Sequence, residues 1–225
     1  MDSINLYTDD FELILVVEGT EVIKDIEALI ANEWIDKSII IIQNKEPKGY
    51  AGALNTGLEL ATGKYICFMN NDTVAVPGWM SSMLKGFKDN VGMVVPTFWG
   101  SGGRQSIEWN DGTEFDYVDN VFSIIGVCFL IKREVLDKIG NWDESFGHGG
   151  EDFDITKRIM DAGYDIVVAR KSFIYHYGGA STRELLNNDV TKAHQNQINK
   201  LELFSKKHNI SMEDIMEKIN TSSRF

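Results

Sequence analysis

Short apolar runs rich in branched residues alternate with amphipathic stretches along the first half of this chain. Residues 11–17 and 38–42 are such runs, and residues 20–34 between them carry apolar side chains at helical spacing. Strands that are buried on both faces and joined by helices are typical of parallel sheets. The alternation therefore predicts an α/β fold with a mostly parallel, Rossmann-like central sheet flanked by helices.

The alternation continues toward the C-terminus. Residues 98–120 are rich in Gly, Trp and acidic residues and lack a period, so we expect a mobile functional loop there. From residue 185 the chain is polar with a partial apolar stripe, which predicts a helical tail that docks on the domain or on another subunit. Helices are predicted at residues 52–62, from about 77, at 133–139 and at 151–162, and strands at 64–69, 91–95, 123–131, 165–169 and 173–175.

Composition argues against several functional classes. The formal net charge of −12 disfavours a nucleic-acid surface, which needs clustered Lys and Arg. No apolar run approaches the roughly 20 residues needed to cross a bilayer, so no membrane span is predicted. The acidic N-terminus does not resemble a secretory signal, which favours the cytoplasm. Cys67 and Cys128 lie in apolar runs and are expected to be buried free thiols.

A carboxylate follows the predicted strand at residues 64–69. Residues 70–73 read Asn-Asn-Asp-Thr, and ligands of open α/β sheets gather beyond the carboxyl ends of the strands. Asp72 could hold Mg²⁺ or Mn²⁺ against a diphosphate there. Formation of a turn is the structural alternative, and the residues alone favour neither interpretation.

Two further groups of residues are candidates for chemistry. Glu151 and Asp152 follow glycines at the predicted start of an amphipathic helix, where a carboxylate either caps the helix or acts as a base on a bound hydroxyl. His176 ends a late strand between two tyrosines. A single His is more often structural, but its imidazole could complete a metal site with Asp72 if the two strands end together.

Several segments in the same order resemble the inverting family 2 glycosyltransferases of the GT-A fold, especially bacterial or viral surface-glycan and rhamnosyl-type transferases. The matching segments are residues 49–57 (GYAGALNTG), 61–73 (ATGKYICFMNNDT), 77–80, 140–158 and 176–181. Several ordered matches are more specific than any single motif. The resemblance implies metal-assisted transfer, with Mn²⁺ or Mg²⁺, from a UDP-, GDP- or dTDP-linked sugar to a hydroxyl of a glycan, a lipid-linked or a protein-linked acceptor.

The resemblance also implies roles for individual residues. Asp152 maps to the catalytic base with Glu151 as its neighbour, and Asp72 and His176 map to the metal ligands. The acceptor and sugar pocket maps to Trp142, Asp143, Gly149 and Gly150, where glycine lets the backbone approach a sugar closely. Donor contacts map to the ends of the first two strands, to the segment at 49–57 and to the triplet: Val17, Glu18, Gln43, Asn44, Gly52, Asn55, Asn70, Asn71 and Asp72.

By the same resemblance, the chain divides into a GT-A catalytic domain over residues 1–184 and a helical C-terminal extension over residues 185–225. The nucleotide-sugar half of the domain would end near residue 97, and the acceptor half would occupy residues 98–184. The alternative from another class is a non-catalytic glycan- or nucleotide-binding module with the same fold. A nucleotidyltransferase is a second alternative, which the lack of a Gly-rich basic loop near the N-terminus disfavours.

Overall fold

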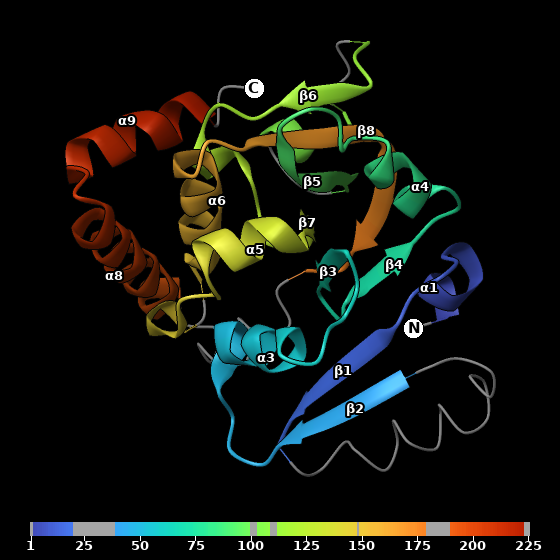
Figure 1. The fold of residues 1–225 in the computed structure, drawn as a ribbon. Helices are drawn as coiled ribbons and strands as arrows, with labels where there is room; N and C mark the ends of the chain where they lie inside the picture. The colour runs from blue at the N-terminus through green and yellow to red at the C-terminus, as the bar shows by residue number, and fades with distance from the viewer. Residues whose placement is uncertain are drawn as a thin grey trace.

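The computed structural model of the chain describes residues 2–19, 39–99, 103–108, 112–147, 149–178 and 190–222. Helices cover a central β-sheet, and two C-terminal helices pack against one end of the domain (Figure 1). In chain order the elements are α1 (Asp2–Tyr7), β1 (Leu13–Glu18), β2 (Ile39–Asn44), α3 (Gly49–Leu58), β3 (Tyr65–Met69), β4 (Thr73–Ala75), α4 (Trp79–Leu84), β5 (Val91–Phe98), η1 (Gly103–Gln105), β6 (Phe115–Tyr117), η2 (Val121–Ser123), β7 (Cys128–Lys132), α5 (Arg133–Ile139), η3 (Glu144–Phe146), α6 (Glu151–Asp161), β8 (Asp165–His176), α8 (Val190–His208) and α9 (Met212–Ser222).

The main sheet has the strand order β3-β7-β5-β8-β4, and β6 also pairs with β8. β5 and β8 are parallel, as are β1 and β2 in a separate pair. β7 runs antiparallel to both β3 and β5, and β4 and β6 run antiparallel to β8. The predicted α/β class with a helix-flanked sheet is confirmed. The sequence did not predict the antiparallel strands. Parallel neighbours need a crossover helix between them, and β7 enters the sheet without one.

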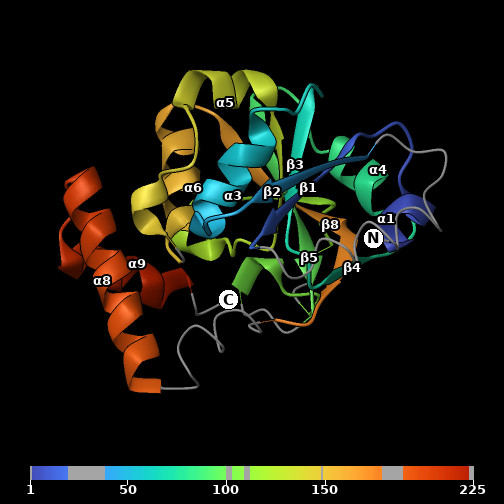
Figure 2. The ribbon, with the colours of Figure 1, turned by 90° about the horizontal axis from the view of Figure 1, so that it is seen from below.

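Both faces of the main sheet are buried. Every residue of β5 is buried, as a strand covered on two sides requires. Met93 packs with residues of α5 and α6 on one face, whereas Val94 packs with Trp79 and Met83 of α4 on the other. Figure 2 shows α3, α5 and α6 on one side of the sheet and α4 on the opposite side. The helices therefore leave the strand ends, rather than the sheet faces, available for ligands.

Most of the predicted elements are present, with some changes at their boundaries. The two late strands form one strand, β8, because a register shift between Pro96 and Thr97 lets its pairing with β5 continue. The strand predicted at residues 123–131 begins only at Cys128, since the chain first forms the short helix η2. The helix predicted at residues 20–34 lies outside the described residues.

Cys67 and Cys128 face each other across β3 and β7. Both are free thiols, and their Sγ atoms are 3.8 Å apart. Cys128 is buried as predicted, but Cys67 is exposed, which corrects the prediction for that residue. The difference follows from the position of β3 at the end of the strand order, where fewer neighbours cover it.

The two C-terminal helices dock on the chain's own domain. Leu201 and Phe204 of α8 and Ile215 of α9 are buried in a cluster with Val121 and Phe146. Of the two predicted docking partners of the tail, the domain and another subunit, the structure shows the domain. Its buried apolar side chains are consequently not available to form a subunit interface. None of the described helices is both long and apolar enough to span a bilayer.

The segment expected to be a mobile loop is anchored in its described parts. β6 pairs with β8, and Asp116 within β6 contacts Arg104 Nη1 at 2.9 Å and Arg170 Nη2 at 2.5 Å. Gln105 is 1% exposed, and its side-chain amide bonds the backbone on two sides. These contacts tie the described parts of the segment to the domain, and its mobility stays a prediction.

Phe204→Ala should lower the free energy of unfolding by about 3–5 kcal/mol, because it removes a fully buried ring and leaves a cavity. Met216→Ala is the matched control on α9, since Met216 is 46% exposed, and it should change the free energy by no more than about 0.5 kcal/mol. Urea unfolding followed by circular dichroism measures both values. An unchanged stability for Phe204→Ala would show that the tail does not share the core of the domain.

Candidate active site

The residues after β3 lie at the edge of the sheet where β7 begins. Asn70 N donates to Val127 O at 3.0 Å, and Thr73 Oγ1 donates to Asn70 O at 2.7 Å. These contacts hold the backbone of the turn. They leave the Asp72 side chain 26% exposed and Asn71 exposed at the same edge.

Asp72 and His176 lie side by side. β4 pairs with the end of β8 so that Thr73 is opposite His176, and Tyr177 N donates to Asp72 O at 3.0 Å. His176 Nε2 is 3.3 Å from Asp72 Oδ1. The imidazole also packs edge-on against Phe98, with a centroid distance of 5.7 Å, which orients the ring. The start of β4 therefore meets the end of β8 and brings the two predicted metal ligands together.

This pair has the chemistry of a partial metal site. Carboxylate oxygens suit Mg²⁺ and Mn²⁺, and neutral imidazole is a common metal ligand. Within the part of the chain that the structure describes, no group of three His, Cys, Asp or Glu side chains could hold a metal ion by itself. A cation beside Asp72 and His176 would therefore take further oxygen ligands from a bound molecule, as a diphosphate supplies.

Two glycines turn the chain into α6. Gly149 has a φ of +97° and Gly150 a φ of +87°, a left-handed conformation that side chains other than glycine rarely adopt. A Cβ on Gly150 would also lie 3.1 Å from atoms of Phe146 and Lys200. Backbone geometry is therefore sufficient to require glycine here, and a role for the two glycines in a sugar pocket stays a prediction.

Asp152 lies in the first turn of α6. Its Oδ2 accepts a hydrogen bond from Gly126 N at 3.1 Å, and its Oδ1 accepts one from Phe153 N at 2.9 Å. Desolvation, with a smaller contribution from the neighbouring Glu151, raises the pKa of Asp152 to about 7. The carboxyl group is therefore held in place and changes its charge near neutral pH.

Glu151 has different surroundings from its neighbour. It is 7% exposed, and its Oε2 has no hydrogen-bond partner among the described residues. Desolvation raises the pKa of Glu151, while backbone N–H groups and the charge of Lys200 act in the opposite direction. The two predicted catalytic acids thus face different parts of the structure.

Tyr50, in the first turn of α3, is a site residue that the sequence analysis missed. Its hydroxyl donates to Asn70 Oδ1 at 2.7 Å and lies 3.3 Å from Gly126 O. Desolvation and the charges of Glu151 and Asp152 raise the pKa of Tyr50 above its ordinary value, so the phenol stays protonated. Its position within residues 49–57 was the available signal, but an aromatic residue on a helix usually indicates the core.

Among the predicted donor residues at the ends of the first two strands, Glu18 holds the start of α3. Val17 is buried, and the Glu18 carboxylate accepts from Lys48 N at 3.1 Å and Gly49 N at 3.0 Å. A negative charge is favourable at that helix end. Contact of these residues with a donor stays a prediction. Asn44 Nδ2 donates to Glu18 Oε1 at 3.1 Å, and Gln43 Nε2 donates to Gly19 O at 2.9 Å.

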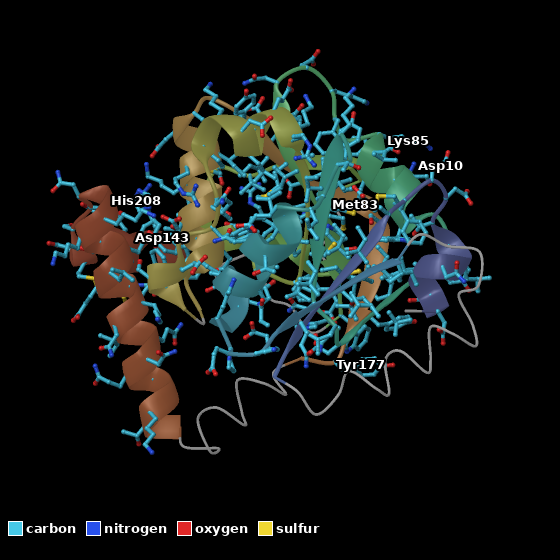
Figure 3. All side chains as sticks on the ribbon, turned by 60° about the horizontal axis from the view of Figure 1, so that its bottom comes forward. Asp10, Met83, Lys85, Asp143, Tyr177 and His208 are labelled. Atoms are coloured by element: carbon cyan, nitrogen blue, oxygen red, sulfur yellow. The ribbon has the colours of Figure 1, made fainter. Side chains whose placement is uncertain are left out.

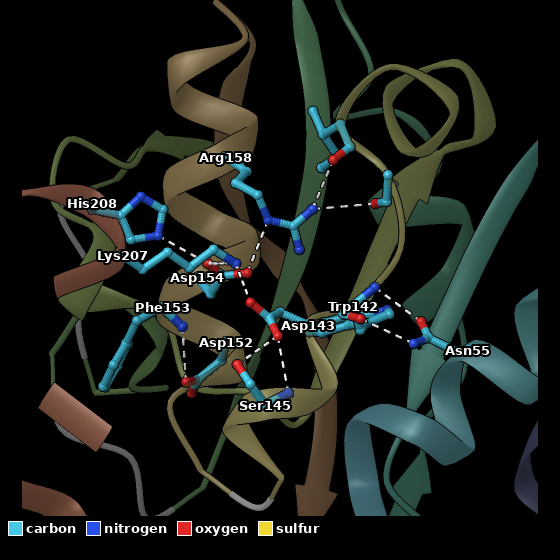
Figure 4. Close-up of polar contacts among 12 residues, drawn as sticks. Asn55, Trp142, Asp143, Ser145, Asp152, Phe153, Asp154, Arg158, Lys207 and His208 are labelled. Carbon is cyan, nitrogen blue, oxygen red and sulfur yellow. Dashed lines mark hydrogen bonds and ion pairs between the residues drawn. The ribbon is translucent and has the colours of Figure 1, made fainter. Parts of the chain in front are cut away.

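Asn55 anchors the loop between α5 and α6. Its Nδ2 donates to Trp142 O at 3.0 Å and to Glu144 Oε1 at 2.8 Å, and its Oδ1 accepts from Trp142 N at 2.9 Å (Figure 4). Asn55 is buried and has these partners within the protein, and its contact with a donor stays a prediction. Glycine at residue 52 is required by α3 itself, because a Cβ there would lie 2.6 Å from Lys48 Cβ.

Trp142 belongs to the core of the domain. It is 3% exposed. Its ring packs against Phe68 and Phe129, with centroid distances of 5.2 and 5.6 Å. Burial of its large apolar surface gives Trp142 a structural role, and its contact with an acceptor stays a prediction.

Asp143 forms an ion pair with α8. Its Oδ2 is 2.5 Å from Lys207 Nζ, and its Oδ1 accepts from Ser145 N at 2.9 Å. Desolvation opposes ionisation, but the hydrogen bonds from Lys207 and Ser145 prevail and lower the pKa of Asp143 to about 2. The carboxylate therefore has a cationic partner within the protein, and its role in a sugar pocket stays a prediction.

The sequence analysis also missed Asp154, which lies near the ion pair of Asp143 with Lys207. Asp154 is fully buried and interacts with side chains of both α6 and α8 (Figure 4). A buried carboxylate needs such partners to offset the loss of hydration. Figure 3 shows Asp143 on the side of the domain that faces α8, which ends at His208. The partners of Asp154 are Arg158 Nε at 2.9 Å, Lys207 Nζ at 2.7 Å and His208 Nε2 at 2.9 Å.

Several known proteins with similar sequences carry the names of glycosyltransferases or of proteins of glycan biosynthesis. Residues 2–140 match the model of glycosyl transferase family 2, and residues 115–196 match that of a glycosyltransferase-like family 2. The O-antigen biosynthesis protein RfbC of Myxococcus xanthus is 24% identical over 195 residues, which cover 76% of this chain and 15% of that protein. The chain spans well under two thirds of the length of such relatives.

Two solved structures share the fold. The mannosyltransferase PcManGT from Pyrobaculum calidifontis, in complex with GDP-Man and Mn²⁺, has a TM-score of 0.64 and 18% identity over 80% of this chain and 52% of that one. GalNAc-T7 with UDP, GalNAc and Mn²⁺ has a TM-score of 0.62 and 16% identity over 77% of this chain and 39% of that one. These similarities confirm the predicted GT-A fold.

Proposed function

The chain belongs to glycosyltransferase family 2, and we propose that it transfers a sugar from a nucleotide-diphosphate donor to a hydroxyl acceptor with inversion at the anomeric carbon. The observation that carries this proposal is the position of Tyr50. Its hydroxyl lies between the Asn70 side chain and the carbonyl of Gly126, whose N–H binds Asp152. The turn after β3 and a carboxylate able to accept a proton therefore belong to one site.

We assign the general base to Asp152. In an inverting displacement the acceptor oxygen attacks the anomeric carbon while the nucleoside diphosphate leaves, and the acceptor proton passes to a base. A carboxylate is most effective when its pKa lies near the working pH, because it is then ionised but still takes up a proton. The pKa of Asp152, raised to about 7, meets this condition. Glu151 is more buried and is assigned a supporting role.

We assign Asp72 and His176 to a divalent cation, Mn²⁺ or Mg²⁺, that binds together with the donor. Their separation of 3.3 Å and their partial exposure suit a shared ion with open positions for phosphate oxygens. When bound, such a cation offsets the charge of the leaving diphosphate. Support comes from the mannosyltransferase and GalNAc-T7 structures, which contain Mn²⁺ with GDP-Man and with UDP, respectively.

The same comparisons favour a UDP- or GDP-linked sugar as the donor, and the sequence resemblance adds a dTDP-linked sugar. Asn70 and Asn71 are uncharged, so Asp72 is the member of the triplet that supplies negative charge to a cation. The acceptor would be a hydroxyl of a glycan or of a lipid- or protein-linked acceptor. The name of the Myxococcus relative favours a surface glycan.

Asp152→Asn should lower the rate of sugar transfer by ~10²–10⁴ while leaving nucleotide binding largely intact, because an amide keeps the size of the side chain but cannot accept a proton. Wild type and variant would be assayed with a panel of UDP-, GDP- and dTDP-sugars by release of the nucleoside diphosphate. Glu151→Gln is the matched control, with a smaller expected effect. A fully active, folded Asp152→Asn variant would refute the assignment of the base.

The transfer rate of the wild type should rise as the pH increases through about 7, the pKa of Asp152, and then level off. The sign follows from the role of a base, which is active only when it is ionised; below its pKa the carboxyl is protonated. A pH profile of kcat/KM measures the midpoint. A midpoint near 4, the ordinary range of an aspartate, would contradict the assigned environment.

Asp72→Asn should weaken Mn²⁺-dependent binding of UDP or GDP by at least about 10-fold. Loss of a residue that merely hydrogen-bonds to a metal ligand typically lowers metal affinity about 10–100-fold, and loss of a ligand should cost at least as much. Isothermal titration with and without Mn²⁺ measures the effect. Asp137→Asn, at an exposed position on α5, is the matched control and should leave binding unchanged. Equal manganese dependence in the wild type and a folded Asp72→Asn variant would remove Asp72 from the metal site.

A further inference from the structure

Tyr50 lies on a part of α3 that is fixed by contacts outside the site. Gly49, just before it, adopts a φ of +73°, and its N–H donates to the Glu18 carboxylate at 3.0 Å. The N–H of Lys48 donates to the same carboxylate at 3.1 Å. β1 therefore holds the start of α3, and with it the backbone that carries the phenol.

The Tyr50 hydroxyl spans two segments that the strand order brings together. It is 2.7 Å from Asn70 Oδ1, in the turn after β3, and 3.3 Å from Gly126 O, just before β7. The N–H of Gly126 is one Cα away from that carbonyl and donates to Asp152 Oδ2 at 3.1 Å. A contact that limits movement of the carbonyl therefore also limits movement of the N–H that binds the carboxylate.

Gly126 and Asp152 are in close contact. A Cβ added to Gly126 would lie 3.1 Å from Asp152 Cβ, tighter than ordinary van der Waals contact. The backbone of residue 126 thus approaches the carboxylate as closely as only a glycine allows. A displacement of a few tenths of an ångström at Gly126 would therefore alter the hydrogen bond to Asp152.

We propose that Tyr50 is a positioning residue for sugar transfer, whose hydroxyl sets the placement of Gly126 N–H against the Asp152 carboxylate and of Asn70 at the donor side. This inference rests on the proposed function, in which Asp152 is the base. Tyr50 acts through Asn70 and Gly126 and takes no proton itself. Because a hydrogen bond to a carboxylate favours its ionised form, the hydroxyl also keeps the base ionised at lower pH.

Among the described residues, the titratable groups whose charges act on Asp152 or on its neighbour come from α6, α3 and α8. Glu151 precedes Asp152 on α6, Tyr50 faces it from α3, and Lys200 of α8 faces Glu151. Replacing Tyr50 by Phe removes one neutral hydroxyl and leaves Glu151 and Lys200 in place. A change in the titration of Asp152 in that variant would therefore report on the hydrogen bond from Gly126.

Carbon-13 NMR titration of the Asp152 carboxyl tests the proposal without any substrate. The signal is assigned by its loss in Asp152→Asn. In Tyr50→Phe, the pH midpoint of Asp152 should move upward, because the Gly126 N–H bond to the carboxylate is loosened. Tyr65→Phe is the matched control on β3, where the ring contacts Phe87 away from the site, and it should leave the midpoint unchanged. An unchanged midpoint in folded Tyr50→Phe overturns the proposal.

A second variant tests the route through residue 126. Gly126→Ala places a methyl group against Asp152 and displaces the carboxylate from the N–H independently of Tyr50. If Tyr50 acts through Gly126, the double variant should shift the midpoint by less than the sum of the two single shifts. Additive shifts would mean that the two residues act independently, which overturns the proposal.

Kinetics provide a readout that a purely structural role would not produce. With the nucleotide sugar that the wild type consumes, Tyr50→Phe should lower kcat about 3- to 10-fold, the equivalent of one hydrogen bond, and leave the donor KM within about twofold. A weakened donor affinity with unchanged kcat would overturn the proposal. A wild type that transfers no sugar would count against the proposed function alone, and the NMR titration would still decide the role of Tyr50.

Discussion

The antiparallel pairing of β3 with β7 determines where the candidate site is built. It sets Met69 opposite Cys128, and one step further the N–H of Asn70 bonds Val127 O at 3.0 Å. Backbone groups in a buried sheet have to be paired, so this ladder is an obligatory part of the fold. Once it forms, the turn after β3 and Gly126 lie side by side. α3 then contributes Tyr50 and α6 contributes Asp152 to the same place.

Three acids in the first turn of α6 have different surroundings, and this difference assigns their roles. Asp154 is fully buried and contacts Arg158, Lys207 and His208, which gives it a structural role. Glu151 is buried with one oxygen unpartnered among the described residues. Among the described residues, Asp152 accepts hydrogen bonds from the backbone N–H groups of Gly126 and Phe153, and desolvation brings its pKa to about 7. Uneven pairing therefore leaves Asp152 as the acid suited to proton transfer at neutral pH.

The loop that leads into α6 is held from two sides. Asn55 of α3 bonds the backbone of Trp142, and Lys207 of α8 bonds Asp143. One neutral hydrogen bond contributes only about 0.5–1.5 kcal/mol, so the burial of Trp142 and of Phe204 dominates the stability of this region. The C-terminal helices consequently help to position the proposed base, although the sequence analysis predicts a boundary near residue 184 between them and the catalytic domain.

The sequence by itself determined the α/β class, the order of most elements and the placement of Asp72 after a strand and Asp152 at the start of a helix. These features depend on periodicity and on glycines within a few residues, and such short-range patterns report burial directly. Tertiary structure alone decided the direction of β7, the contact of Tyr50 with Asn70 and Gly126, and the bonding partners of Asn55, Trp142 and Asp143. Their partners are distant along the chain: 87 residues separate Asn55 from Trp142, and 64 separate Asp143 from Lys207. A local pattern indicates that a polar side chain will be buried, but only the packing of distant segments determines which group will bond it.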